Sequence, residues 1–179
     1  MKKLSISILF LFIILGIKAQ DNTIQSNNLK ETGIIRLDSI KSFKDLTEKF
    51  KGKVIYIDIM ASWCKPCIEE LKSHKQLEEY FNENNIVKIF ISIDQKEHVD
   101  TCVSLLRRYE INGYFITQWT AGTEFNKELM NKFLTDENGN ITISIPRYSI
   151  IDKNGDFVEM KAQRPSSFQS LKTQLSKYL

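Results

Sequence analysis

Residues that mark non-globular chains are scarce in this sequence. Only 7 Gly and 3 Pro occur among 179 residues, far too few for a collagen-like or low-complexity chain. No stretch is rich enough in Pro or Ser to form a long linker, and no repeat of solenoid period is visible. The 42% hydrophobic and 26% charged residues are typical of globular proteins. One domain with one core is expected, since single domains run to roughly 100–200 residues.

Long hydrophobic runs are absent except at the N-terminus. A short basic start precedes an almost unbroken apolar run over residues 4–17, and small and polar residues follow it. This is the layout of a secretory signal peptide, and the run is shorter than the ~20 residues of a membrane-spanning helix. We expect a signal peptide over 1–19, cleaved near Ala19, then a flexible lead-in over 20–32 and a domain over 33–179. An uncleaved membrane anchor is the alternative.

A strong excess of one charge is also absent. The chain has 25 Lys+Arg against 22 Asp+Glu. Lys2, Lys3 and Lys18 lie in the expected leader, so its removal leaves 22 basic residues against 22 acidic ones. A nucleic-acid-binding surface needs basic residues in excess on one face, and nothing in this balance indicates one.

Cysteine is limited to Cys64, Cys67 and Cys102, an odd number that leaves one thiol without an obvious partner. A C-x-x-C pair in a zinc site usually has a second such pair or paired histidines, and His74 and His98 do not have that spacing. A haem attachment site needs His directly after the second cysteine, where an isoleucine stands. We therefore expect no metal and no cofactor. Redox exchange is favoured over a zinc site or a purely structural disulfide.

Hydrophobic patterning predicts an α/β domain with parallel crossovers and an antiparallel edge. The run over 54–59 is β-branched and apolar, as in a strand covered on both faces. Asn154-Gly155 predicts the turn of a hairpin. The predicted strands are 33–37, 54–59, 86–93, 147–152 and 156–160. The predicted helices are 42–50, one from the cysteine pair to about 81, 97–109, 124–134, and one from 165 to the C-terminus.

The spacing of the cysteine pair suits thiol–disulfide exchange. With Cys64 at the start of a helix, its sulfur faces free backbone N–H groups and the positive end of the helix dipole. Both favour the thiolate, lowering a pKa of ~8.5 to about 4–7. Cys67 lies one helical turn further on and can reach back to form the disulfide. Pro66 lacks an N–H, and this loss costs nothing in the first turn.

Three segments together resemble a known family. Residues 58–70 resemble the active-site segment of the TlpA/ResA-type thioredoxin-like proteins, which are exported thiol–disulfide oxidoreductases. Residues 145–155 look like that family's cis-proline loop and following hairpin, and residues 163–167 resemble its C-terminal end. The resemblance covers roughly 33–179 and implies a thioredoxin-like α/β fold, with a central mixed sheet flanked by helices.

The resemblance also implies residue roles. Cys64 would be the attacking thiolate, and Cys67 would resolve the mixed disulfide. Pro146 would be cis, beside the cysteines, and the backbone of Ile145 would pair with a substrate strand. The residues expected to contact the substrate are Trp63, Lys65, Pro66, Ile145 and Pro146.

Two acidic residues complete the predicted site. Asp58 matches the buried acid of thioredoxin, and a carboxylate inside an apolar strand is costly unless it is paired or protonated. Burial should raise its pKa and suit it to take the proton of Cys67 through a water. The alternative for Asp58 is a solvent-facing edge position. Glu70 matches an acid frequent in the family, and it is either a local tuner of the cysteine pair or a solvated surface residue.

Other positions are interpreted as structural, or depart from the family pattern. Cys102 lies in the 97–109 helix and is expected to be a buried small apolar residue, and a regulatory thiol is the alternative. His74 and His98 have charged neighbours and are predicted to lie at the surface. Met60 stands where the family usually has Trp, and Lys72 where it often has a Pro that kinks the helix.

The function that follows is exchange of dithiol for disulfide with protein partners in the periplasm. The resemblance favours the reducing direction, in cytochrome c maturation or disulfide repair, with a membrane protein as electron donor. A disulfide oxidase or isomerase uses the same residues at a different potential. A non-catalytic binding module with the same fold is the alternative from another class.

Overall fold

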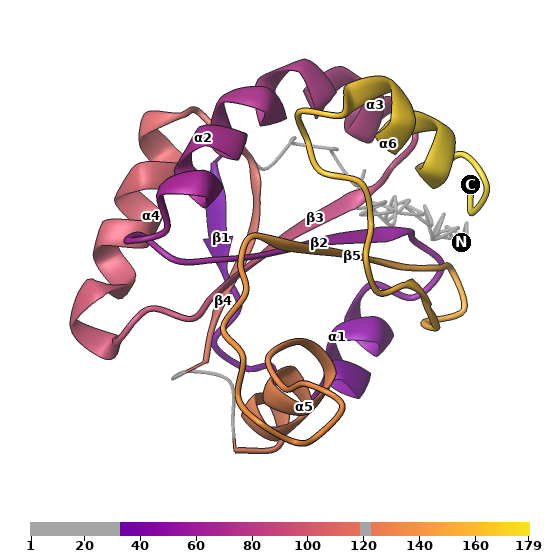
Figure 1. The fold of residues 1–179 in the computed structure, drawn as a ribbon. Helices are drawn as coiled ribbons and strands as arrows, with labels where there is room; N and C mark the ends of the chain where they lie inside the picture. Colours follow the sequence, from indigo (N-terminus) through magenta and orange to yellow (C-terminus); the bar gives the residue numbers. More distant parts are fainter. Residues whose placement is uncertain (1–32, 119–122) are drawn as a thin grey trace, which may run out of the picture. The chain divides into compact units, whose positions relative to one another are not determined.

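The computed structural model describes residues 33–118 and 123–179, so the expected signal peptide and lead-in lie outside the described residues. The described chain forms a six-stranded mixed sheet in the order β1-β4-β3-β2-β5-β6 (Figure 1). Among the described residues, no helix is long and apolar enough to cross a membrane. The strands are β1 (Ile34–Arg36), β2 (Ile55–Met60), β3 (Val87–Ser92), β4 (Gly113–Thr117), β5 (Arg147–Ile151) and β6 (Phe157–Glu159).

Helices cover both faces of this sheet, as the thioredoxin-like expectation requires (Figure 1). They are α1 (Phe43–Lys49), α2 (Lys65–His74), α3 (Glu78–Glu83), α4 (Val99–Arg108), α5 (Thr123–Phe133) and α6 (Phe168–Leu175), with 3₁₀ turns at Lys75–Leu77 and Lys96–His98. On one face, Tyr56 of β2 contacts Phe81 of α3, with ring centroids 5.6 Å apart. On the other face, Phe43 of α1 stacks on Phe125 of α5 at 4.5 Å.

The two central strands carry the core. All six residues of β2 and all six of β3 are buried, because both faces of these strands are covered by helices. β2 pairs with β3 in parallel and with β5 antiparallel, with Ile59 opposite Arg147. The carboxyl end of β2 therefore adjoins the start of β5, and both lead into the segments that carry the predicted site.

Sequence patterning missed β4 and misplaced two helix boundaries. β4 is short and pairs in parallel with β1 and β3, contacts between distant segments that no local pattern encodes. The helix predicted to run to about residue 81 is divided by the 3₁₀ turn into α2 and α3. The last helix begins at Phe168 rather than at 165, because Ser166 is held in a loop by Glu70. The hairpin at Asn154-Gly155 is confirmed, and Gly155 has φ 95°.

We predict that Gly113→Ala destabilises the sheet more than Gly52→Ala does. A Cβ at Gly113 would lie 3.0 Å from the carbonyl oxygen of Lys88 and 3.1 Å from the ring of Phe90. Gly52 has φ 81° and open space around the added carbon, so its substitution costs backbone strain alone. The additional loss at Gly113 should be about 1–3 kcal/mol, as for other overpacked sites. Chemical denaturation of both variants measures it, and equal losses would contradict the close packing of β4 on β3.

Candidate active site

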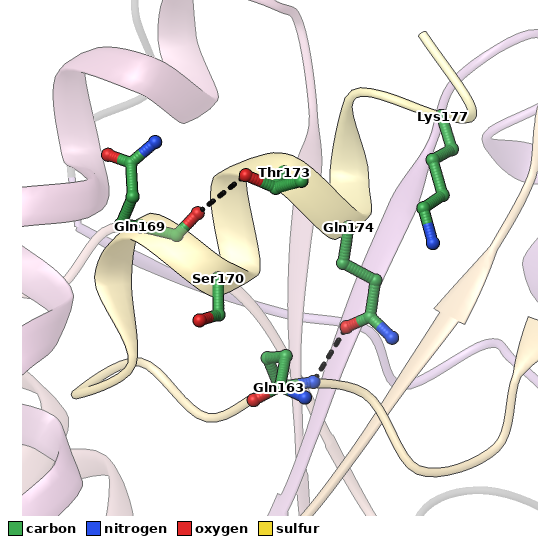
Figure 2. Close-up of a pocket in the computed structure, with 6 residues that line it drawn as sticks. All are labelled: Gln163, Gln169, Ser170, Thr173, Gln174 and Lys177. Carbon is green, nitrogen blue, oxygen red and sulfur yellow. Dashed lines mark hydrogen bonds between the residues drawn. The ribbon is translucent and has the colours of Figure 1, made fainter.

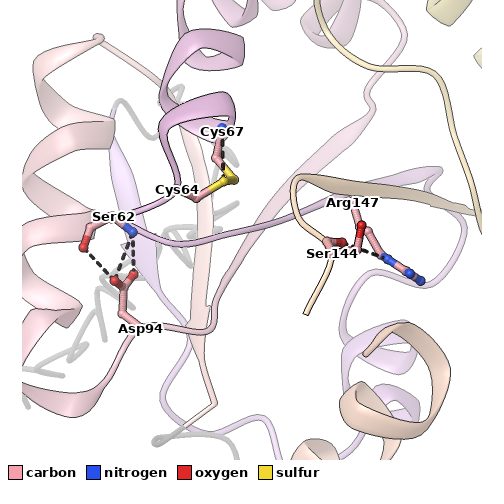
Figure 3. Close-up of a disulfide and its surroundings, with 6 residues drawn as sticks. All are labelled: Ser62, Cys64, Cys67, Asp94, Ser144 and Arg147. Carbon is pink, nitrogen blue, oxygen red and sulfur yellow. Dashed lines mark hydrogen bonds between the residues drawn. A yellow bond between two sulfur atoms is a disulfide. The ribbon is translucent and has the colours of Figure 1, made fainter. Parts of the chain in front are cut away.

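The disulfide between Cys64 and Cys67 lies at the start of α2 (Figure 3). Its S–S distance is 2.04 Å, and both residues are buried. Cys64 is the N-cap residue of α2, and the backbone N–H of Cys67 donates to Cys64 Sγ at 3.2 Å. In the reduced protein this donor and the helix dipole stabilise the Cys64 thiolate relative to the thiol. Pro66 occupies the first turn without loss of a hydrogen bond.

A buried aspartate holds the loop that leads into the cysteine pair. Asp94, two residues after the end of β3, accepts hydrogen bonds from the backbone N–H of Ser62 at 2.9 Å and from Ser62 Oγ at 2.6 Å (Figure 3). Ser92 Oγ donates to the same carboxylate at 2.8 Å. These bonds fix the turn between β2 and α2. Asp94 was not among the predicted site residues, although an acid close to the end of a buried strand, beside the end of a parallel neighbour, is a usable signal.

The Ile145–Pro146 peptide bond is cis, as expected. Pro146 precedes Arg147, which pairs with Ile59 of β2, so the proline stands at the end of the sheet from which the cysteine loop leaves. Arg147 Nε donates to the carbonyl of Ser144 at 3.0 Å and closes the loop around the proline (Figure 3). The residues of this loop are exposed or half-buried, so a substrate segment can reach it.

Asp58 is buried in β2 with an exposed fraction of 2%, so the solvent-facing alternative is wrong. Burial raises the pKa of its carboxyl, and the hydrogen bond with His74 opposes that shift. His74 Nε2 lies 3.1 Å from Asp58 Oδ2. The prediction that His74 lies at the surface is also wrong, because its exposed fraction is 1%. It follows Cys67 by seven residues, two helical turns, and so shares the buried face of α2.

Glu70 connects α2 to the C-terminal part of the chain. Its carboxylate accepts hydrogen bonds from the backbone N–H and the hydroxyl of Ser166, each at 2.9 Å, and Arg164 lies 3.4 Å away. With an exposed fraction of 7%, Glu70 is not the solvated residue of the alternative interpretation. These bonds fix the loop before α6 against the active-site helix.

The other residues singled out from the sequence differ in their exposure to solvent. Trp63 is 58% exposed, and Lys65 and Pro66 are exposed beside it, so all three are accessible to a partner. Cys102 is buried, and burial raises the pKa of its thiol, which agrees with a packing role and makes the thiol unreactive. His98 is exposed, as predicted.

Two surface hollows lie near the C-terminal half of the chain. One, of about 350 Å³, is lined by Ser144, Pro146, Arg147, Tyr148, Met160, Lys161, Ala162, Gln163 and Arg164. It adjoins the cis-proline and includes three cationic side chains. The other, of about 320 Å³, lies on α6 between Gln163 and Lys177 (Figure 2). Its lining residues include neither a cysteine nor an acid, so it offers nothing for redox chemistry.

Comparison with solved structures finds the same fold. A crystal structure of a candidate thiol-disulfide oxidoreductase from Bacteroides vulgatus is 29% identical with a TM-score of 0.56, covering 73% of this chain and 82% of that one. A solution structure with the same description, also from Bacteroides vulgatus, is 25% identical with a TM-score of 0.52, covering 73% and 78%. A thioredoxin-family thiol:disulfide interchange protein from Chlorobium tepidum TLS, 18% identical with a TM-score of 0.52, covers 72% and 83% and shows the fold alone. None of the curated proteins matches this chain.

A thioredoxin fold with a disulfide between C-x-x-C cysteines at the start of α2 defines a thiol–disulfide oxidoreductase. The family model described as Redoxin matches residues 19–175, and the chain belongs to the Redoxin family.

We predict that Asp58→Asn stabilises the oxidised protein at neutral pH. A carboxyl whose pKa is raised on folding favours the folded state while protonated, and this contribution is lost as the pH rises through the folded-state pKa. At pH 7 the substitution removes the free-energy cost of ionising a carboxyl whose pKa is raised on folding, on the order of 1–3 kcal/mol. Urea unfolding at several pH values measures the difference, which should shrink as the pH falls toward the unfolded value of ~3.9. A difference that does not change with pH would contradict this account of Asp58.

Proposed function

We propose that this enzyme is a TlpA/ResA-type oxidoreductase of the periplasm that reduces disulfides in protein partners. The observation that carries the proposal is the placement of the Cys64–Cys67 disulfide and the cis-Pro146 loop at one end of the sheet. We further propose the layout described above: a signal peptide over 1–19, a lead-in over 20–32 and the thioredoxin-like domain over 33–179. The subtype, the location and the reducing direction rest on the sequence resemblance.

The proposed reaction proceeds in two exchanges. The Cys64 thiolate attacks one sulfur of a substrate disulfide, and the other substrate sulfur leaves as a thiolate. Cys67 then gives its proton to Asp58 through a water, and its thiolate attacks Cys64 Sγ and releases the second substrate thiolate. The substrate gains two electrons, and the enzyme is left with the Cys64–Cys67 disulfide, the form that the structure describes. A dithiol of a membrane partner would reduce this disulfide for the next cycle.

Substrate binding is proposed at the surface around the cis-proline. An extended substrate segment would pair with the backbone of Ile145 beside Pro146, while Trp63, Lys65 and Pro66 contact the region around its cysteine. Trp63 supports this role because so large an apolar side chain is 58% exposed, and aromatic residues are enriched at protein interfaces.

One observation favours the opposite direction. The N–H of Cys67 bonds to Cys64 Sγ, and stabilising the thiolate stabilises the reduced enzyme and makes the couple more oxidising. Disulfide oxidation or isomerisation by the same residues is therefore the second candidate function. A non-catalytic binding module is disfavoured, because docking alone has no use for a buried acid such as Asp58.

We predict that Cys67→Ser converts the enzyme into a trap for its partners. Without the resolving thiol, the mixed disulfide at Cys64 persists, since no second thiolate is adjacent to displace the substrate. Non-reducing electrophoresis of acid-quenched samples should show adducts that disappear with reductant. Mass spectrometry should locate the link at Cys64.

The matched control is Cys64→Ser/Cys67→Ser, which should give no adducts. If Cys67→Ser traps nothing, the exchange mechanism is wrong. If Cys64→Ala leaves the biological function intact, the binding module is the correct interpretation.

A further inference from the structure

His74 and Asp58 form a fully buried pair beneath the active-site helix. His74 Nε2 and Asp58 Oδ2 are 3.1 Å apart, and both side chains are at most 3% exposed. The ring of His74 also contacts Phe90 of β3, with centroids 5.1 Å apart. Among the described residues, Asp58 Oδ1 and His74 Nδ1 have no hydrogen-bond partner. The carboxylate is thus held at one oxygen and free at the other.

The free atoms indicate the protonation state of the imidazole. If Nε2 carries the proton, it donates to Asp58 Oδ2, and Nδ1 is an unprotonated acceptor in an apolar site. In an imidazolium, Nδ1 would be a buried N–H donor without a partner, on a charged ring. Burying such a group costs considerably more free energy than burying an unpaired acceptor on a neutral ring. The geometry therefore favours a neutral His74 that donates through Nε2 to the Asp58 carboxylate.

His74 is too distant from the cysteines to act on them directly. It follows Cys67 by seven residues of one helix, a separation of about 10.5 Å along the axis. Asp58 lies in β2 and contacts His74 while its second oxygen stays free. Any effect of His74 on the exchange reaction must therefore pass through Asp58.

We propose that His74 is a positioning residue for the exchange reaction: its Nε2–H fixes Oδ2 of Asp58 and leaves Oδ1 as the acceptor for the Cys67 proton. This inference rests on the proposed role of Asp58 as proton acceptor. It concerns a residue that the C-x-x-C motif does not include, and it gives the buried face of α2 a second function beside packing.

The surroundings of Asp58 set the direction of the effect. Burial and the charge of Glu70 raise the pKa of Asp58, and His74 opposes them. The other titratable groups that interact with Asp58 are Tyr56, Tyr148 and Cys102, each with a raised pKa. None of these three offers a cation at neutral pH. Without His74, Asp58 should be protonated at higher pH, and its ability to accept the Cys67 proton should be lost first at low pH.

The test separates the two exchange steps with the chromogenic disulfide dithionitrobenzoate. Reduced enzyme releases one coloured thiolate when Cys64 attacks and a second when Cys67 resolves the mixed disulfide. His74→Leu should leave the first step unchanged and move the pH midpoint of the second step upward. Below the midpoint the second step should slow about tenfold or more, the effect of losing a hydrogen bond to a charged group. His74→Gln keeps an N–H donor and should restore much of the rate.

Control variants separate this inference from the proposed function. Asp58→Asn should slow the second step by itself, and His74→Leu should then add nothing. If Asp58→Asn has no effect, the role of Asp58 fails, and with it the proposal for His74. If Asp58→Asn slows the step but His74→Leu does not, only the His74 proposal is overturned.

Two further variants control for misfolding of the His74→Leu protein. His74→Asn, whose amide is too short to reach Oδ2, should shift the profile as His74→Leu does. His98→Leu removes an exposed histidine and should leave it unchanged. Equal profiles for the Asn and Gln variants would show that His74 is needed for packing alone.

Discussion

Only four residues separate the end of β2 from the start of α2, and this short connection positions the chemistry of the enzyme. β2 is buried along its whole length, so its direction is fixed by the core, and the turn after Met60 has little freedom. Asp94 restricts this turn further, because its carboxylate accepts hydrogen bonds from both the N–H and the hydroxyl of Ser62. Cys64 therefore caps α2 at a fixed place, with its sulfur against the N–H of Cys67.

The same helix carries three further functional contacts on its buried face. Cys67 completes the disulfide, Glu70 holds the loop before α6 through Ser166, and His74 contacts Asp58. Glu70 and His74 follow Cys67 by three and seven residues, and His74 follows Glu70 by four, so the helical repeat places all three on one face. A polar group on this face needs a partner because it is removed from water. The partners found for Glu70 and His74 connect α2 to the C-terminal segment and to the central strand.

The sequence predicted the parts of this arrangement that are local in the chain. The C-x-x-C pair, the buried strand before it and the hairpin after the cis-proline each have a short pattern with a physical cause. β4 and the buried position of His74 were not predicted, because both depend on contacts between distant segments. The charged neighbours of His74 in the chain predicted a position at the surface. Its position along α2, however, places it on the buried face of that helix. Asp94 was not predicted either, although an acid near the end of a buried strand is a local signal.

The reduction potential of the Cys64/Cys67 couple tests the account of this enzyme as a reductase most directly. Protein without residues 1–19 would be equilibrated in thiol/disulfide buffers, and free thiols counted by alkylation and intact mass. The account predicts a potential near or below that of thioredoxin, about −270 mV. A potential of about −120 to −180 mV, where strong oxidants and isomerases lie, would contradict it and assign the enzyme to disulfide formation or shuffling.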